Sequence, residues 1–287
     1  MDKSLLETVL HDFEHWENSS PHPINVGLGL VTKPVAFALN PLMSKLAPLL
    51  EGVVSKANEY ISAAVDSVSN KTPGFDAADA KSFEEWFARA NKEAENWKLA
   101  GVGSLTVEGG ATGAGGMALL LVDIPASFSL ILGFANKIAL TYGLPIKSEQ
   151  VQIAILNAVC AGTANTLKDK TAAIHGLKNA EKILRTSNWK HIYSQSIDNV
   201  LSTEGIIVAV REFLKKMGIN ITSRKAPQVI PAVIGAAAGA TINCAWAADA
   251  LEAVRQFSRK WAVETYYSKS GQESDTPALV SNSPPCD

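Results

Sequence analysis

The feature that most constrains this chain is a pair of long stretches with almost no charge and many small residues. Ala100 to Pro145 carries only three formal charges, at Glu108, Asp123 and Lys137, and Ala226 to Ala248 carries none over 23 residues. The second stretch is long enough to span a bilayer, yet it is rich in Ala and Gly rather than Leu, Ile and Phe. Tight packing in a soluble core and insertion into lipid are therefore both open.

The glycines of these stretches recur at helical spacing. Gly109 and Gly113 are four residues apart, and so are Gly235 and Gly239. Small residues at this spacing let two helices approach closely, in a soluble core as well as in lipid. We expect each stretch to form a Gly/Ala-rich apolar helical hairpin, around residues 109–140 and 228–248.

The rest of the chain has the apolar periodicity of amphipathic helices. Residues 4–17 predict a short amphipathic helix, and residues 176–217 alternate charged and apolar positions in the same manner. Ser82, followed by Glu85, has the spacing of a capping box and predicts a helix start. Ser148 is the expected cap of a helix that fades near Asp169, and the last helix is expected from Asp249 to Tyr267.

These elements predict an all-α fold, a multi-helix bundle that contains the two apolar hairpins. We expect three parts: an N-terminal amphipathic helix over 1–20, a helical domain over 21–267 and a disordered Ser/Pro/Gly-containing tail over 268–287. The chain is long and apolar enough to bury a sizeable core.

The charge balance and the cysteines exclude several classes of protein. With 26 basic and 28 acidic side chains, the chain has no net field that would gather nucleic acid. Its three cysteines are widely spaced and form no CxxC pair, which argues against a disulfide framework or a structural zinc site. The first residues lack the basic start and apolar run of a secretory signal. We therefore expect a cytoplasmic protein.

His11, Glu14 and His15 match the H-x-x-E-H spacing of one class of zinc peptidases. The match is weak, because it lies on a predicted surface helix within the first fifteen residues and a peptidase needs a third zinc ligand. We interpret it as a solvated helix face and predict no metal site.

A second motif can be interpreted as a strand, a glycine loop and a helix. Residues 104–107 would be the strand, and Gly113, Gly115 and Ala118 fit a loose dinucleotide-binding pattern. However, the expected second strand with an acidic ribose-binding residue does not follow. We predict no cofactor.

Asp123 is a carboxylate between two apolar runs, and it must be capped, paired or neutralised there. The residues that follow, Ile124 and Pro125, favour a helix cap, because Asp accepts amide hydrogen bonds at a helix start and proline suits the first turn. Arg255 and Arg259 are possible ion-pair partners. A catalytic role for Asp123 has no visible partner.

Two segments resemble the EcsC family. The first runs through Gly109 to Gly116, then Leu121 to Pro125, then Tyr142 and Gly143. The second runs from Pro231 through Gly235, Gly239 and Asn243 to the Phe257, Ser258 and Arg259 cluster. The resemblance would cover roughly residues 30–265. Gly133 departs from it, because a basic residue is expected at about that position.

The resemblance implies an α-helical protein associated with an ABC transporter system, without a catalytic mechanism that can be carried over. Together with the low charge of the two stretches, it predicts a non-enzymatic factor at the cytoplasmic membrane face, peripheral or partly inserted, in contact with lipid or with a membrane transporter. The alternative is a small-molecule binder or an enzyme with a pocket near Asp123, and a third hypothesis is an adaptor recognised through residues 176–217. The candidate motif residues are Gly109, Gly113, Gly116, Asp123, Pro125, Tyr142, Gly143, Gly235, Gly239, Asn243 and Arg259.

Overall fold

The structure is a computed structural model that describes residues 4–21, 49, 52, 57–68, 80–113, 120–186 and 232–273. Every element in these ranges is an α-helix, which confirms the all-α prediction. The helices are α1 (Ser4–Asn18), α4 (Ala57–Val68), α5 (Ala80–Gly113), α6 (Leu120–Thr141), α7 (Glu149–Gly162), α8 (Leu167–Thr186) and α11 (Ala232–Glu273).

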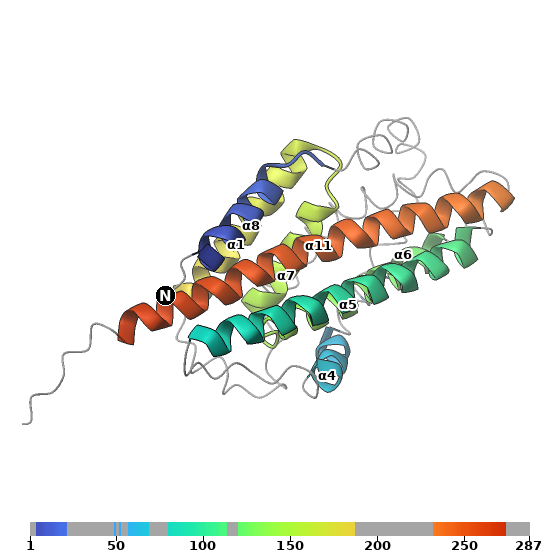
Figure 1. Ribbon diagram of the computed structural model, residues 1–287. Helices are drawn as coiled ribbons and strands as arrows, with labels where there is room; N and C mark the ends of the chain where they lie inside the picture. Colours follow the sequence, from blue (N-terminus) through green and yellow to red (C-terminus); the bar gives the residue numbers. More distant parts are fainter. Residues whose placement is uncertain are drawn as a thin grey trace, which may run out of the picture.

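Three of these helices, α5, α6 and α11, form a long bundle (Figure 1). Helices α5 and α11 are antiparallel, since Glu108 of α5 contacts Asn243 of α11 whereas Phe83, near the start of α5, stacks on Tyr266. Helix α6 returns along α5, because Ser127 also reaches Glu108 and Tyr142 reaches Asn91. The α6 and α11 helices therefore run in the same direction.

The remaining described helices cover one part of this bundle. Helix α7 packs on both α8 and α11, α1 packs on α11, and α4 packs on α6. Figure 1 shows α5, α6 and α11 continuing beyond α1, α7 and α8 towards the right-hand side. One end of the long bundle is thus layered by shorter helices, and the other end extends past them.

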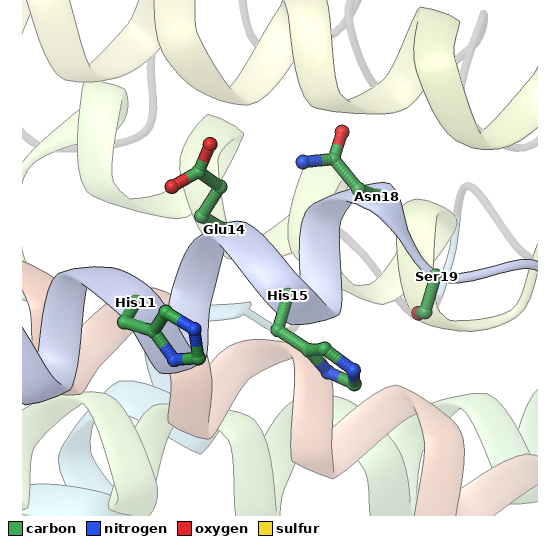
Figure 2. Close-up of a pocket in the computed structure, with 5 residues that line it drawn as sticks. All are labelled: His11, Glu14, His15, Asn18 and Ser19. Atoms are coloured by element: carbon green, nitrogen blue, oxygen red, sulfur yellow. The ribbon is translucent and has the colours of Figure 1, made fainter.

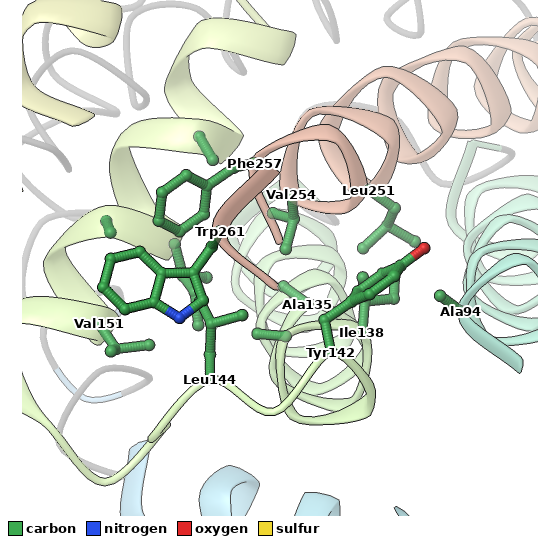
Figure 3. Close-up of a cluster of buried hydrophobic side chains, with 14 of the residues drawn as sticks. Ala94, Ala135, Ile138, Tyr142, Leu144, Val151, Leu251, Val254, Phe257 and Trp261 are labelled. Atoms are coloured by element: carbon green, nitrogen blue, oxygen red, sulfur yellow. The ribbon is translucent and has the colours of Figure 1, made fainter. Parts of the chain in front are cut away.

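The core lies where α6, α7 and α11 meet. Figure 3 shows the rings of Phe257 and Trp261 on α11 facing Val151 of α7 and Leu144 of the connecting turn, with all four side chains buried. Val9 and Phe13 of α1 belong to the same buried cluster. The N-terminal helix is therefore built into the core of the domain through its apolar face.

Local sequence signals set several helix ends. Ser148 is the N-cap of α7, as predicted, although its hydroxyl donates to Gln150 Oε1 (3.1 Å) rather than bonding to the backbone. At the end of α6, Gly143 adopts a φ of 78°, and the amides of Gly143 and Leu144 donate to the carbonyls of Leu140 and Ala139 (2.8 and 3.1 Å). This is a Schellman motif, in which the residue with a left-handed backbone conformation is usually glycine.

Other predicted boundaries are wrong. The helix after Ser148 does not fade near Asp169 but ends at Gly162, and α8 begins at Leu167. Thr166 caps this second helix, because its hydroxyl donates to the Asp169 carboxylate (2.7 Å) and accepts from the Asp169 amide (3.1 Å). Helix α5 begins at Ala80, so Ser82 lies inside the helix rather than at its cap.

The two low-charge stretches are parts of long continuous helices. Residues 232–248 form the first part of α11, which continues without a break to Glu273, so they are not a separate hairpin before a helix at Asp249. Residues 104–107 are helical within α5, which excludes the strand of the dinucleotide-binding alternative. Of the predicted tail, 268–273 belong to α11, and 274–287 lie outside the described residues.

Glycines let other helices approach closely, and two of these glycines lie against α11. A Cβ atom on Gly101 of α5 would lie 2.5 Å from Leu251 Cδ1 of α11, and one on Gly162 of α7 would collide with the Asp249 carbonyl oxygen of α11. By contrast, a Cβ on Gly133 of α6 would meet nothing within 4 Å. Close approach is thus seen at Gly101 and Gly162, whereas the prediction for Gly109, Gly113, Gly235 and Gly239 concerns residues whose surroundings lie outside the described ones.

This difference gives a paired prediction for glycine substitutions. We expect Gly162→Ala to lower the free energy of unfolding by about 1–3 kcal/mol, because the added methyl group overpacks a backbone contact. Gly133→Ala should leave stability unchanged or raise it by up to about 1 kcal/mol, because alanine favours a helix interior. Urea unfolding followed by circular dichroism measures both, and an unchanged Gly162→Ala variant would contradict the close packing.

Candidate functional site

The low-charge parts of α5, α6 and α11 gather at the extending end of the bundle. We call residues 99–113 of α5, 120–136 of α6 and 232–248 of α11 the arm. These 49 residues contain two formally charged side chains, Glu108 and Asp123. At 1.5 Å per residue, each helix of the arm is about 20–25 Å long. The arm is therefore a long helical surface with very little charge.

A buried polar junction ties the three helices of the arm together. Glu108 Oε2 on α5 accepts a hydrogen bond from Ser127 Oγ on α6 (2.7 Å) and another from Asn243 Nδ2 on α11 (3.0 Å). Ser127 and Asn243 are fully buried. Hydrogen bonds to a carboxylate are about twice as strong as neutral ones, so this junction fixes the register of α5, α6 and α11 within the arm.

One side of α5 in the arm exposes apolar atoms to solvent. Leu99 and Val107 are 60% and 75% exposed, and Ala100 and Gly103 lie exposed on the same stretch. Leu99, Gly103 and Val107 are four residues apart, so they form one stripe along the helix. Single exposed apolar residues are common, but here the stripe lies on a surface that also has almost no charge.

A charged network marks the base of the arm. Glu252 of α11 accepts two hydrogen bonds from Arg255 (2.6 and 2.9 Å), one from Lys98 of α5 (3.0 Å) and one from Gln256 (2.7 Å). Burial alone would raise the pKa of the Glu252 carboxyl, but the hydrogen bonds and charge of Arg255, together with Lys98, outweigh burial and hold that pKa below its ordinary value. The carboxylate is therefore charged and clamps α5 to α11.

A second polar group lies beyond the base, away from the arm. Tyr142 Oη donates to Asn91 Oδ1 (2.8 Å), and burial raises the pKa of this phenol well above its usual value, although the nearby Arg255 and Arg259 oppose the rise. Arg259 is 3.4 Å from the Asp12 carboxylate of α1. Tyr142 and Arg259 thus help to join α6, α5, α11 and α1 in the body of the protein.

The predicted motif residues fall into two separate groups. Within the arm, Gly109 and Gly113 lie in the last turns of α5, Asp123 and Pro125 lie in α6, and Gly235, Gly239 and Asn243 lie in α11. Tyr142, Gly143 and Arg259 lie in the body, and Gly116 is outside the described residues. The motif therefore does not converge on one pocket, and Asn243 is its member at the buried junction.

The predicted cap at Asp123 is wrong. Leu120 to Val122 are already helical, so Asp123 and Pro125 lie inside α6. The proline is tolerated there because it removes only one backbone hydrogen bond near the start of the helix. The suggested pairing of Asp123 with Arg255 or Arg259 stays a prediction, because the Asp123 side chain lies outside the described ones. In the structure, Arg255 pairs with Glu252 and Arg259 with Asp12. The predicted pocket near Asp123 stays a prediction, because the Asp123 side chain is not among the described ones.

The H-x-x-E-H residues lie on the exposed face of α1. Figure 2 shows His11 and His15 on one side of the helix and Glu14 pointing away from His15, around a shallow hollow that Asn18 and Ser19 also line. Within the part of the chain that the structure describes, no three His, Cys, Asp or Glu side chains are placed to hold a metal ion. The arrangement matches a solvated helix face.

Sequence reasoning missed two members of the junction. Glu108 was visible as one of only three charges between Ala100 and Pro145, and a lone carboxylate in such a stretch signals a buried hydrogen-bonded group. Ser127 gives no comparable signal, because a serine on an apolar helix commonly bonds to its own backbone. Its role depends on the antiparallel register of α5 and α6.

Comparison with known proteins gives one match. The model of the EcsC protein family matches residues 7–261, which include most of α1 and the whole junction. No curated protein and no solved structure matches the chain. Among the described helices, none combines the length and hydropathy needed to cross a membrane.

The junction predicts energetic coupling between α5 and α11. We expect Glu108→Ala and Asn243→Ala each to lower the free energy of unfolding by about 1–3 kcal/mol, because each leaves buried polar groups without their hydrogen bond. The double variant should lose less than the two single losses combined, by about 1 kcal/mol. Ser104→Ala is the control, with an expected change within about 0.5 kcal/mol, because its hydroxyl bonds only within α5. If the loss of unfolding free energy in the double variant equals the sum of the two single losses, this would contradict the energetic coupling through the junction.

The network at the base predicts a dependence of stability on pH. Because the pKa of Glu252 is lower in the folded protein than in the unfolded chain, its contribution is present above the unfolded pKa and is lost as pH falls through the folded pKa. We expect the wild type to lose stability below about pH 4.5, and Glu252→Gln to lose less in that range while being less stable at neutral pH. Thermal unfolding across the pH range tests this, with exposed Glu84→Gln as the control. Equal pH profiles for wild type and Glu252→Gln would contradict it.

Proposed function

We propose that this chain, which belongs to the EcsC protein family, is a non-enzymatic factor that acts at the cytoplasmic face of a membrane. In this proposal the arm is the contact surface, and the layered body with α1, α7 and α8 remains in water. The arm meets the lipid surface or the helices of a membrane transporter. The observation that carries the proposal is the exposed apolar stripe of Leu99, Gly103 and Val107 on a nearly uncharged helical surface.

The position of charge along the chain supports this function. The ion pairs of Lys98, Glu252 and Arg255 lie at the base of the arm, and Lys137 at the same level covers the Trp97 ring (4.6 Å). Beyond them the arm has two carboxylates, Glu108 and Asp123, and Glu108 is directed to Ser127 and Asn243 rather than into water. Placing the arm against an apolar partner would therefore remove little charge from water, and that desolvation is the main electrostatic cost of such a contact.

The rigidity of the arm supports the same function. The junction at Glu108 and the clamp at Glu252 hold α5 and α11 at two levels separated by 10 residues of α5, from Lys98 to Glu108. A surface that is already ordered loses less conformational entropy when it binds. The arm can therefore present its apolar stripe without first folding on its partner.

Flotation with liposomes tests the proposal. We expect the full-length protein to float with vesicles in high salt as well as in low salt, because an apolar contact is not screened by ions. Val107→Asp should reduce the floated fraction about tenfold, since it places a charge on the contact surface at a cost of more than about 1.4 kcal/mol. The exposed position of Val107 makes this substitution compatible with folding.

Ile183→Asp is the matched control. Ile183 is also an exposed apolar residue, at 51%, but it lies on α8 and not on the arm. This variant should float like the wild type. Absence of wild-type flotation at either salt concentration would overturn the lipid contact and direct the search to a transporter. Equal losses in both variants would show that the arm is not the contact surface.

A further inference from the structure

The exposed face of α5 continues from the apolar stripe towards the body of the protein. Arg89, Lys92 and Asn96 are exposed and precede Leu99 at steps of three or four residues, which places all four on one face of the helix. Helices α6 and α11 pack against other sides of α5. This outer face of α5 therefore carries two basic groups, then an amide, then the apolar stripe.

The two basic groups on the outer face are not neutralised by carboxylates. Within the part of the chain that the structure describes, neither Arg89 nor Lys92 forms an ion pair. The basic groups at the base of the arm differ, because Lys98 and Arg255 both pair with Glu252. Arg89 and Lys92 therefore present their charges to whatever the outer face meets.

The acidic residues of α5 do not interrupt this arrangement. Glu85 is exposed one turn beyond Arg89, on the side away from the arm. Glu93 directly follows Lys92 and so projects about 100° away from it, and Glu95 pairs with the basic groups at the base of the arm. From the arm towards the body, the order along the outer face is thus apolar, amide, basic and acidic.

This order and its spacing suit a lipid surface. At 1.5 Å per residue, Lys92 and Arg89 lie about 10 and 15 Å along α5 from Leu99. An amphipathic helix buries its apolar face about 5–10 Å into the boundary between headgroups and acyl chains, and long basic side chains extend to the polar layer. A helix that meets the membrane at an incline, with its apolar stripe first, brings both bases to the headgroups.

We propose that the outer face of α5 selects anionic phospholipids. Lys92 and Arg89 donate to the headgroup phosphates while the apolar stripe enters the acyl boundary. This inference rests on the proposed membrane contact and adds the class of lipid to it. An acidic protein surface would match the two bases but not the stripe, whereas an anionic bilayer matches both.

Flotation of the full-length protein with two kinds of vesicle tests the selection, one of phosphatidylcholine alone and one of phosphatidylcholine mixed with phosphatidylglycerol. The chain has a formal net charge of −2, so a preference for the anionic vesicles requires a local basic surface. At low salt, binding to the mixed vesicles should be at least about tenfold tighter. High salt should reduce this preference, because it screens charge, while binding to the neutral vesicles persists.

The outcomes separate this proposal from the membrane contact itself. Equal binding to both kinds of vesicle at low salt would overturn the selection of anionic lipid and leave the apolar contact standing. Flotation with neither kind would overturn both, and would direct the search for a partner of Arg89 and Lys92 to acidic protein surfaces.

Paired variants locate the selection on α5. Arg89→Gln combined with Lys92→Gln should bind both kinds of vesicle equally, and the exposure of both side chains makes this variant compatible with folding. Lys168→Gln combined with Lys182→Gln removes the same charge from exposed positions of α8 and should keep the preference. A preference that survives in the α5 variant would overturn the proposal. Equal losses in the two variants would also overturn it, because net charge would then account for the selection.

Discussion

The rest of the structure depends on the antiparallel packing of α5 against α11. Small residues along both helices, among them Ala90, Ala94, Ala247 and Ala250, are fully buried and allow this contact to continue over most of their length. Gly101 adds a close approach between the two helices, where a Cβ would press on Leu251. Because α1, α6 and α7 all pack on α11, its position determines theirs.

Polar contacts fix the register of α5 against α11. Alanine and glycine surfaces alone allow one helix to slide along another, since their shapes are nearly uniform. The junction at Glu108 and the clamp at Glu252 each require specific partners, so a shift by one turn would break hydrogen bonds to two buried or half-buried carboxylates. The arm can therefore be poor in charge and still have a defined arrangement.

Local features of the sequence predicted the helices better than their ends or their partners. The apolar spacing of residues 4–17 and the capping position of Ser148 act over one or two turns, and both predictions agree with the structure. The cap at Asp123 failed because a proline signals the first turn of a helix but does not exclude a helix that has already begun. The continuity of α11 was missed because composition changes at Asp249 whereas the backbone does not.

The candidate site was even harder to predict from local features of the sequence than the helix ends. Asn243 stood out by its position in a Gly-rich segment, yet its partner Glu108 is 135 residues away and Ser127 lies on a third helix. Such sites arise from tertiary register, which depends on the α5 and α11 contact. A change at Gly101 would therefore affect the junction of Glu108, Ser127 and Asn243, which does not contain that glycine.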